Sequence, residues 1–181
     1  MIRIQFPAAL LLGVFASLQA VHADPGQLFP KVKSETLAKQ KLVLPDDFKA
    51  QRNVILISFG RDMQKAVDAW DAALAPVRDG TAVQVYNTPL IPNPGAIVRG
   101  FISGGMRSVY KDPAVRERVV VLYVDEDEYF PALGVGDKSA PLVVVTDRTG
   151  RELGRVQSEV TDDALGRVQA LIAAPDGAPN P

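Results

Sequence analysis

The 181-residue sequence contains no cysteine and a single histidine, His22. Without cysteine, the chain cannot carry out thiol–disulfide exchange or peroxidatic cysteine chemistry, and it has no thiolate to bind a metal. His22 lies in an N-terminal segment that we expect to be removed. A mature chain with neither residue also lacks Ser-His-Asp and Cys-His catalytic sites and His-ligated zinc, copper or iron. We therefore expect no cofactor, no metal and no enzymatic activity, although chemistry by carboxylates, lysine, tyrosine or backbone amides stays open.

Residues 1–23 have the pattern of a secretory signal peptide. Arg3 precedes an uncharged apolar run over residues 4–21, and small residues surround an expected cleavage site before Asp24. The alternative is an uncleaved membrane anchor, because the run is nearly long enough for the roughly 30 Å hydrocarbon core of a bilayer. Pro7 and the polar residues near the end of the run favour cleavage. The mature protein is accordingly expected in the periplasm, held at the inner membrane if the segment is not cut.

The charge balance argues against nucleic acid as a partner. Cleavage removes Arg3, one of 20 basic residues, and leaves 19 basic against 21 acidic residues, a net charge of −2. A nucleic-acid-binding domain needs an excess of basic residues to displace counterions. Because an oxidising compartment would permit disulfides and this chain has none, its stability must come from its hydrophobic core.

Strand-like and helix-like segments alternate in the first half of the chain. Residues 24–44 predict an N-terminal arm with a short hairpin or edge strand, and residues 46–51 predict one helical turn. Residues 53–59 lack polar alternation, which is typical of a central strand covered on both faces. After Gly60, apolar residues recur at the three-and-four spacing of a helix that lies on a sheet. These residues are Met63, Ala66, Val67, Trp70, Ala73 and Leu74.

A second strand and a second helix follow. Residues 81–87 alternate in polarity, so with the preceding helix they predict a parallel βαβ unit. Residues 88–95 hold three prolines and predict a loop. Residues 95–110 predict a helix in which Gly104-Gly105 marks a break, a kink or a close backbone contact. The apolar stripe of this helix consists of Ile97, Val98, Phe101 and Ile102.

The remaining third of the domain predicts two short helices, a hairpin and a final helix. Pro113 opens a helical turn, residues 119–125 predict a third buried strand, and the acidic run Asp125–Glu128 opens a short helix. Residues 140–158 predict a hairpin with Gly150 in its turn, and residues 161–174 predict the last helix. The tail, residues 175–181, is rich in Pro and Gly and is expected to be disordered.

This order of elements resembles the thioredoxin fold with the insertions common in its peroxiredoxin-like branches, over roughly Leu44 to Ala174. The resemblance implies an α/β domain at residues 45–174 with a central mixed sheet flanked by helices. It also implies that the Ala140-Pro141 bond is cis, the alternative being a trans proline that starts a strand. In redox members, two cysteines lie just beyond the first buried strand, so the resemblance implies a non-redox protein here. The residues at that location are Gly60, Arg61, Asp62 and Met63.

Four segments, at residues 54–74, 97–110, 122–125 and 143–155, are similar to the ATPase assembly factor ten family. That family is associated with assembly of the membrane sector of ATP synthase, so the similarity implies a non-redox chaperone. The export signal departs from the transit sequence of the mitochondrial members, and it leaves the identity of the client open. The positions carried over from the family are Trp70, Arg99, Phe101, Met106, Arg107, Ser108, Asp147 and Gly150.

We therefore predict a surface that binds a protein partner, with a membrane protein as client, around the location of the missing thiols. An alternative is a small anion or metabolite held by the free amides at the start of the first helix, and in the simplest interpretation Asp62 only caps that helix while Arg61 is solvated. The basic stretch at residues 99–118 is either a contact for anionic lipids or an acidic partner, or a solvated helical face. The predicted partner-binding residues are Gly60, Arg61, Asp62, Arg99, Arg107, Ser139, Ala140 and Pro141.

Overall fold

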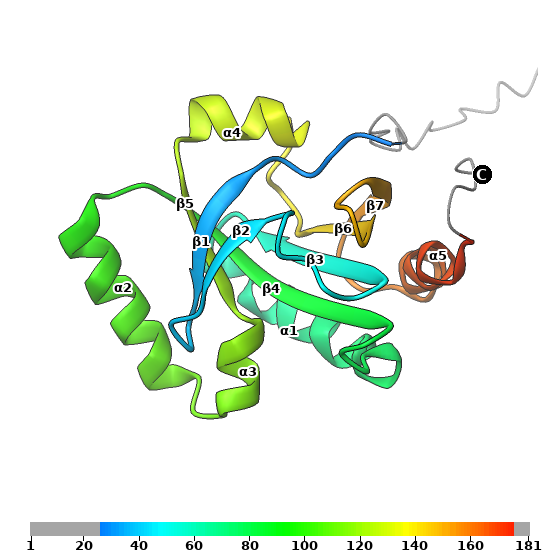
Figure 1. Cartoon of the computed structure of the whole chain (residues 1–181), viewed down its shortest axis with the longest axis horizontal. Helices are drawn as coiled ribbons and strands as arrows, with labels where there is room; N and C mark the ends of the chain where they lie inside the picture. The colour runs from blue at the N-terminus through cyan, green and yellow to red at the C-terminus, as the bar shows by residue number, and fades with distance from the viewer. Residues whose placement is uncertain (1–25, 176–181) are drawn as a thin grey trace, which may run out of the picture.

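The computed structural model describes residues 26–175, which form a mixed β-sheet with helices on both faces (Figure 1). The predicted signal peptide and tail residues 176–181 lie outside the described residues. Within the described part of the chain, no helix is both long enough and apolar enough to cross a membrane.

The sheet contains seven strands, which are β1 (Val32–Thr36), β2 (Lys41–Leu44), β3 (Arg52–Ser58), β4 (Val83–Pro92), β5 (Val120–Val124), β6 (Leu142–Asp147) and β7 (Glu152–Gln157). Their order across the sheet is β2-β1-β5-β4-β3-β6-β7. β3, β4 and β5 are parallel, which confirms the predicted βαβ unit. β1 and β6 pair antiparallel with β5 and β3, so the predicted N-terminal hairpin joins this sheet through β1.

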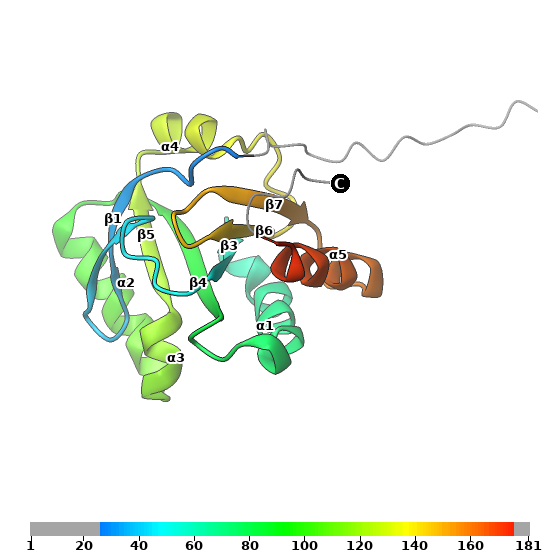
Figure 2. The ribbon, with the colours of Figure 1, turned by 45° about the vertical axis from the view of Figure 1, so that its right-hand side comes forward.

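The helices are α1 (Gln64–Ala73), α2 (Ala96–Val109), α3 (Pro113–Arg118), α4 (Glu126–Leu133) and α5 (Asp162–Ala173), with 3₁₀ turns at Arg61–Met63 and Ala75–Val77. Strand residues point alternately to the two faces of a sheet. Val54 and Val143 pack under α1 and α5, whereas Ile55 and Val144 belong to the cluster that contains α4. Figure 2 shows α4 and α1 on opposite sides of the sheet. Since both faces are covered, every residue of β3 is buried, as its continuous apolar run predicts.

Three of the residues carried over from the family have structural roles. Trp70 is fully buried, and its Nε1 donates to the backbone oxygen of Ser158 at 2.9 Å. Asp147 shapes the β6–β7 turn, because its Oδ1 accepts from the backbone amides of Thr149 and Arg151 at 2.8 and 3.0 Å. Gly150 has a φ of 82°, and a Cβ there would collide with Pro45. Glycine is therefore required at this turn.

The predicted helical turn at residues 46–51 is wrong. Residues 45–47 form a turn, and the chain continues without helix to β3. The Asp47 carboxylate accepts from the backbone amide of Val43 at 2.6 Å, and the Asp47 amide donates to the Val43 oxygen at 2.9 Å. These bonds hold Asp47 against β2, an edge strand of the sheet, and satisfy backbone groups that an edge otherwise leaves free.

The predicted loop at residues 88–95 is also wrong in its first half, because β4 continues to Pro92. β4 changes neighbours along its length: it pairs with β3 as far as Pro89, and with β5 from Leu90 to Pro92. Pro89 therefore lies where the pairing with β3 ends, and Pro92 lies where the pairing with β5 ends. A proline cannot donate to the ladder, and such positions tolerate it.

Gly104 and Gly105 do not interrupt the second helix, which contradicts the predicted break, and they make no close contact with the described part of the chain. α2 runs unbroken from Ala96 to Val109. A Cβ at either glycine would find no atom within 4 Å among the described residues. The glycines are therefore not required by the packing of the protein's own fold.

Candidate functional site

Residues from two distant segments lie at the end of the sheet where the resemblance to the thioredoxin fold places the two cysteines of redox members. β3 and β6 are antiparallel with Ile57 opposite Leu142, so the residues that follow β3 and those that precede β6 lie at the same end of the sheet. This register brings Gly60, Arg61 and Asp62 to the end where Ala140 and Pro141 lie. We call these five residues the former thiol edge.

A 3₁₀ turn, and not the first turn of α1, follows Gly60 at this edge. Arg61 and Asp62 are exposed, while Met63 is buried and its sulfur accepts from the Phe59 amide at 3.5 Å. The start of neither the 3₁₀ turn nor α1 has a side-chain capping hydrogen bond, so the interpretation of Asp62 as a helix cap is wrong. Its carboxylate instead lies over Gly60, where a Cβ would collide with it. A carboxylate in this position opposes the binding of a second anion at the same turn.

The loop before Pro141 is held in place by hydrogen bonds. The Asp137 carboxylate accepts from the hydroxyl and the amide of Ser139, at 2.7 and 2.9 Å, and these bonds hold the pKa of Asp137 below its usual value. The Gln157 amide donates to the backbone oxygens of Asp137 and Ala140, at 2.7 and 3.3 Å. This loop therefore presents Ala140 in a fixed position.

The Ala140-Pro141 bond is trans, which corrects the expectation of a cis bond; the cis bond of the described residues is Leu44-Pro45. Trans is the intrinsically favoured isomer of an X-Pro bond. Pro141 immediately precedes β6, a position at which a trans proline is readily accommodated.

Sequence reasoning missed an aromatic pair beside this edge. The rings of Phe59 and Phe130 meet edge to face with their centroids 6.0 Å apart, and Lys138 Nζ lies 4.3 Å from the centroid of Phe130. Both phenylalanines are half-buried. Phe59 directly follows β3 and Phe130 lies on α4. These segments are far apart in the sequence, and no local pattern predicts their contact. Since Phe59 directly precedes Gly60, the pair adds partly exposed apolar surface at this edge.

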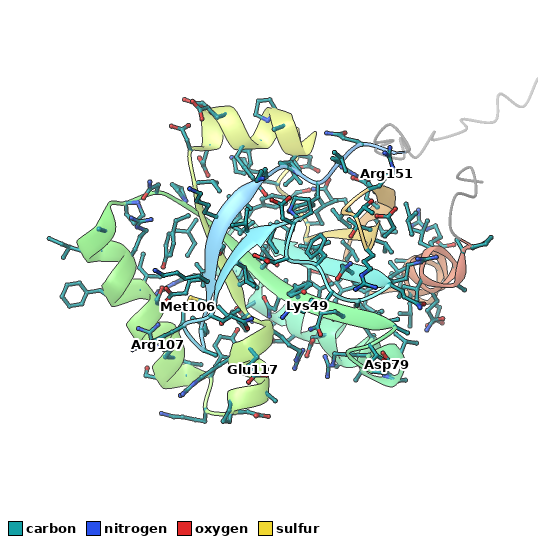
Figure 3. All side chains as sticks on the ribbon, viewed as in Figure 1. Lys49, Asp79, Met106, Arg107, Glu117 and Arg151 are labelled. Carbon is teal, nitrogen blue, oxygen red and sulfur yellow. The ribbon has the colours of Figure 1, made fainter. Side chains whose placement is uncertain are left out.

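Arg99 and Arg107 lie in a different region, a groove of about 500 Å³ between the β1–β2 hairpin and α2. Figure 3 shows Arg107 on α2 near the tip of this hairpin. The guanidinium of Arg99 lies 5.8 Å from the ring centroid of Tyr123 on β5, and β4 separates β5 from β3. The structure thus divides the predicted partner-binding residues between the former thiol edge and this basic groove. The groove is lined by Lys33, Ser34, Glu35, Thr36, Lys41, Leu42, Val43, Arg99, Gly100, Ser103, Arg107, Val121 and Tyr123.

The other arginines of the basic stretch hold the fold together. Arg116 donates to the backbone oxygens of Tyr110 and Arg107, at 2.6 and 2.8 Å. Arg118 pairs with Asp71 of α1 at 2.6 Å, and Arg78 pairs with the same carboxylate oxygen. The stretch is therefore not one uniform basic surface.

α2 has an unusual orientation, because it turns its apolar side to solvent. Four of the five exposed large hydrophobic residues within residues 26–175 lie on this helix: Ile97 (79%), Val98 (45%), Phe101 (77%) and Val109 (74%). Residues four apart share one side of a helix. Ile97, Phe101, Gly105 and Val109 follow that spacing, and with Val98 they define what we call the outer face of α2.

The opposite side of α2 carries polar and mixed residues and packs on the protein. Arg99, Ser103, Met106 and Tyr110 are spaced by four, three and four residues, and all are half-buried. Ser103 Oγ and Tyr123 Oη are hydrogen-bonded at 2.9 Å, while Met106 and Tyr110 pack against a small cluster formed by Leu37, Val119 and Val121. Of the apolar stripe predicted from the sequence, Ile97, Val98 and Phe101 are therefore not covered by the described part of the chain, whereas Ile102 is half-buried.

No protein-family model matches the chain, and no characterised protein matches it in sequence. Solved structures do match its fold. The thioredoxin domain of a thiol-disulfide oxidoreductase from Bacteroides vulgatus is 13% identical, with a TM-score of 0.57 over 83% of this chain and 99% of that one. A peroxiredoxin-like protein from Aquifex aeolicus is 14% identical, with a TM-score of 0.52 over 81% and 86%.

BsSco, a member of the Sco family of cytochrome c oxidase assembly proteins, is 10% identical with a TM-score of 0.54, over 84% of this chain and 98% of that one. These likenesses establish the fold: the chain is a thioredoxin-like α/β protein of the peroxiredoxin-like type, as its sequence predicts. It has this fold without the cysteines of thiol chemistry. The narrower resemblance to the ATPase assembly factor ten family continues to rest on the sequence segments alone.

Proposed function

We propose that this protein is exported and acts at the inner membrane as a non-redox, non-enzymatic factor that binds and helps to assemble a membrane-protein client. The observation that carries the proposal is the outer face of α2. Large apolar side chains exposed side by side mark an interaction surface, because isolated soluble proteins rarely expose them in contiguous patches.

The chemistry of this face favours an apolar helix of a partner protein. An amphipathic helix that binds at a lipid surface carries Lys and Arg on a free polar side, whereas the polar side of α2 is packed on the sheet. Gly105 lies in the outer face with open space above it, and Gly104 is its neighbour. Small residues allow the backbone of a second helix to approach closely, and protein partners therefore fit this face better than lipid does.

The former thiol edge gives a second contact for the same partner. Arg61 and the half-buried pair of Phe59 and Phe130 combine a cation with apolar surface at the end of the sheet. The alternative function, binding of a small anion at this edge, has less support because the carboxylate of Asp62 lies over Gly60.

Site-specific photocrosslinking in intact membranes tests the proposal. A photoreactive residue at Phe101 is expected to capture a membrane protein, and one at Arg61 is expected to capture the same protein. The control position is Arg167 on α5, which is exposed and lies in neither region. Equal capture at Phe101 and Arg167, or capture of unrelated proteins in proportion to their abundance, would refute a specific client.

A further inference from the structure

The basic groove concentrates positive charge in a protein whose net charge is −1. Its lining contains four cations, Lys33, Lys41, Arg99 and Arg107, and one carboxylate, Glu35, for a net charge of +3. Within residues 26–175, none of the four cations forms an ion pair, although cations elsewhere do so: Arg78 and Arg118 with Asp71, and Arg155 with Glu152. Four cations without a carboxylate partner among the described residues, gathered in one concave region, attract an anionic ligand from outside the chain.

The spacing of the cations indicates the shape of that ligand. Arg99 and Arg107 are eight residues apart on one helix, which separates them by about 12 Å along the groove. Lys41 lies opposite Glu35 in the β1–β2 register, and Glu35 is two positions from Lys33 on β1. Lys33 and Lys41 are therefore separated by about 7 Å along the strands. One phosphate or carboxylate cannot reach all four, whereas an extended peptide places every second side chain about 7 Å apart.

One wall of the groove holds a cation in position before any ligand arrives. The guanidinium of Arg99 lies over the ring of Tyr123, 5.8 Å from its centroid. The Tyr123 hydroxyl is hydrogen-bonded to Ser103 Oγ at 2.9 Å and donates to the Arg99 backbone oxygen at 3.3 Å. Arg116 bonds the Arg107 backbone oxygen and so fixes the far end of α2. Side chains held in this way lose less entropy when they bind.

The position of the groove distinguishes a peptide from a membrane surface. Arg99 lies on the sheet-facing side of α2, and the groove that it shares with Arg107 is closed on its other side by the hairpin. The outer face of α2 points the other way, so a flat bilayer that contacts this face does not reach into the groove. A flexible segment of a protein partner can reach both.

We propose that the groove between the β1–β2 hairpin and α2 binds an extended acidic peptide segment, with Arg99 and Arg107 as its main carboxylate contacts. This inference rests on the proposed function in one respect, since it takes the segment to belong to the partner that covers α2. Lys33 and Lys41 contribute charge from the opposite wall.

Fluorescence anisotropy with the purified full-length protein and a labelled 12-residue peptide, glutamate alternating with serine, tests the inference. We expect this peptide to bind at least about tenfold more tightly than the same peptide with glutamine, and to weaken as salt screens the charges. The double variant R99E/R107E should reduce affinity at least about tenfold. Since Arg99 contacts Tyr123, the variant K33E/K41E on exposed positions repeats the test without touching α2.

The matched control is R148E/R167E, which makes the same charge change at two exposed positions outside the groove. An equal loss in this control would show that net charge alone attracts the peptide, and would overturn the site. Binding of anionic phospholipid vesicles that depends on Arg99 and Arg107, without peptide binding, would likewise overturn it. Peptide binding without capture at Phe101 would refute the client proposal alone, and capture without peptide binding would refute the groove alone.

Discussion

α1 and α2 share a pattern of apolar residues at helical spacing, but their apolar sides lie in opposite environments. Each follows a strand of the parallel unit and carries an apolar stripe with an aromatic residue in it. α1 buries its stripe, with Val67, Trp70 and Leu74 at most 1% exposed, whereas Phe101 of α2 is 77% exposed. Periodicity thus predicts that a helix has an apolar side, but it does not say whether that side is covered by the same chain or by another.

The difference arises from what lies beneath each helix. α1 packs against β3 and β4 near the centre of the sheet, where Val54 and Val85 offer an apolar surface. α2 lies near β5 and the β1–β2 hairpin, where polar groups of Tyr123, Lys33 and Glu35 lie beside only a small apolar cluster. Each helix therefore turns toward the sheet the side that matches it, and α2 is left with its apolar side outward.

Replacing Trp70 with alanine is expected to have the largest effect on stability. The side chain is fully buried and its Nε1 is bonded to the Ser158 oxygen, so Trp70→Ala should lower the free energy of unfolding by about 3–5 kcal/mol. Urea unfolding followed by circular dichroism measures the change. A loss below about 1 kcal/mol would mean that α1 is not packed as described, and the contrast between the two helices would fail.

Replacing both Gly104 and Gly105 with alanine is expected to stabilise the free protein. Neither position has φ in the left-handed region or any neighbour that a Cβ would meet, so each change should add up to about 1 kcal/mol of helix propensity. Thermal unfolding measures this gain.

The same double variant also tests the outer face of α2. If a partner helix packs closely over Gly105, capture by the crosslinker should fall while the melting temperature rises. A lower melting temperature would contradict the open space above the glycines, and unchanged capture would contradict a close helix approach.

Phe101→Ser should change the free energy of unfolding by less than about 0.5 kcal/mol, because the ring is mostly exposed and the two residues have similar helix propensities. Binding of a hydrophobic dye should decrease, since the largest side chain of the outer face is gone. The comparison with Trp70→Ala is direct: one aromatic residue is needed for folding, the other is free to bind. A loss of more than about 1 kcal/mol would mean that the protein itself uses Phe101.

The sequence predicts the central part of the fold well because burial is visible within each segment: β3 is a continuous apolar run, and the apolar residues of α1 recur at helical spacing. The β1–β2 hairpin, the short helices and the turn at Gly150 also follow from local patterns. The course of β4 through Pro89 and Pro92 does not, because it depends on a change of neighbouring strand that no local pattern shows.

The candidate site is predicted less completely, for the same reason. Gly60 and Pro141 come together because β3 and β6 are neighbours, as the fold resemblance implies. Arg99 is separated from them by the order of the strands, and Lys33 reaches the groove only because the N-terminal hairpin pairs with β5. Contacts that depend on strand order cannot be derived from residue spacing.

Tyr110 joins the two helices and gives the smallest predicted effect. It ends α2, its hydroxyl accepts from Gln64 Nε2 of α1 at 2.9 Å, and its pKa is raised from 10.0, first by burial and then by the nearby carboxylate of Asp68. A raised pKa means that the folded protein favours the neutral phenol. The stabilisation is fully present below the unfolded value near 10 and is lost as the pH rises through the folded value.

Between pH 8.5 and 11, the wild-type protein should therefore lose more stability than Tyr110→Phe, which has no proton to release. Urea unfolding at each pH measures the difference, and absorbance at 295 nm follows the ionisation of the tyrosines directly. Parallel stability profiles for the two proteins would show that Tyr110 ionises without cost. In that case the contact between α1 and α2 would be loose, and the orientation of the outer face of α2 would depend on the packing of Met106 and Tyr110 against Val119 and Val121 alone.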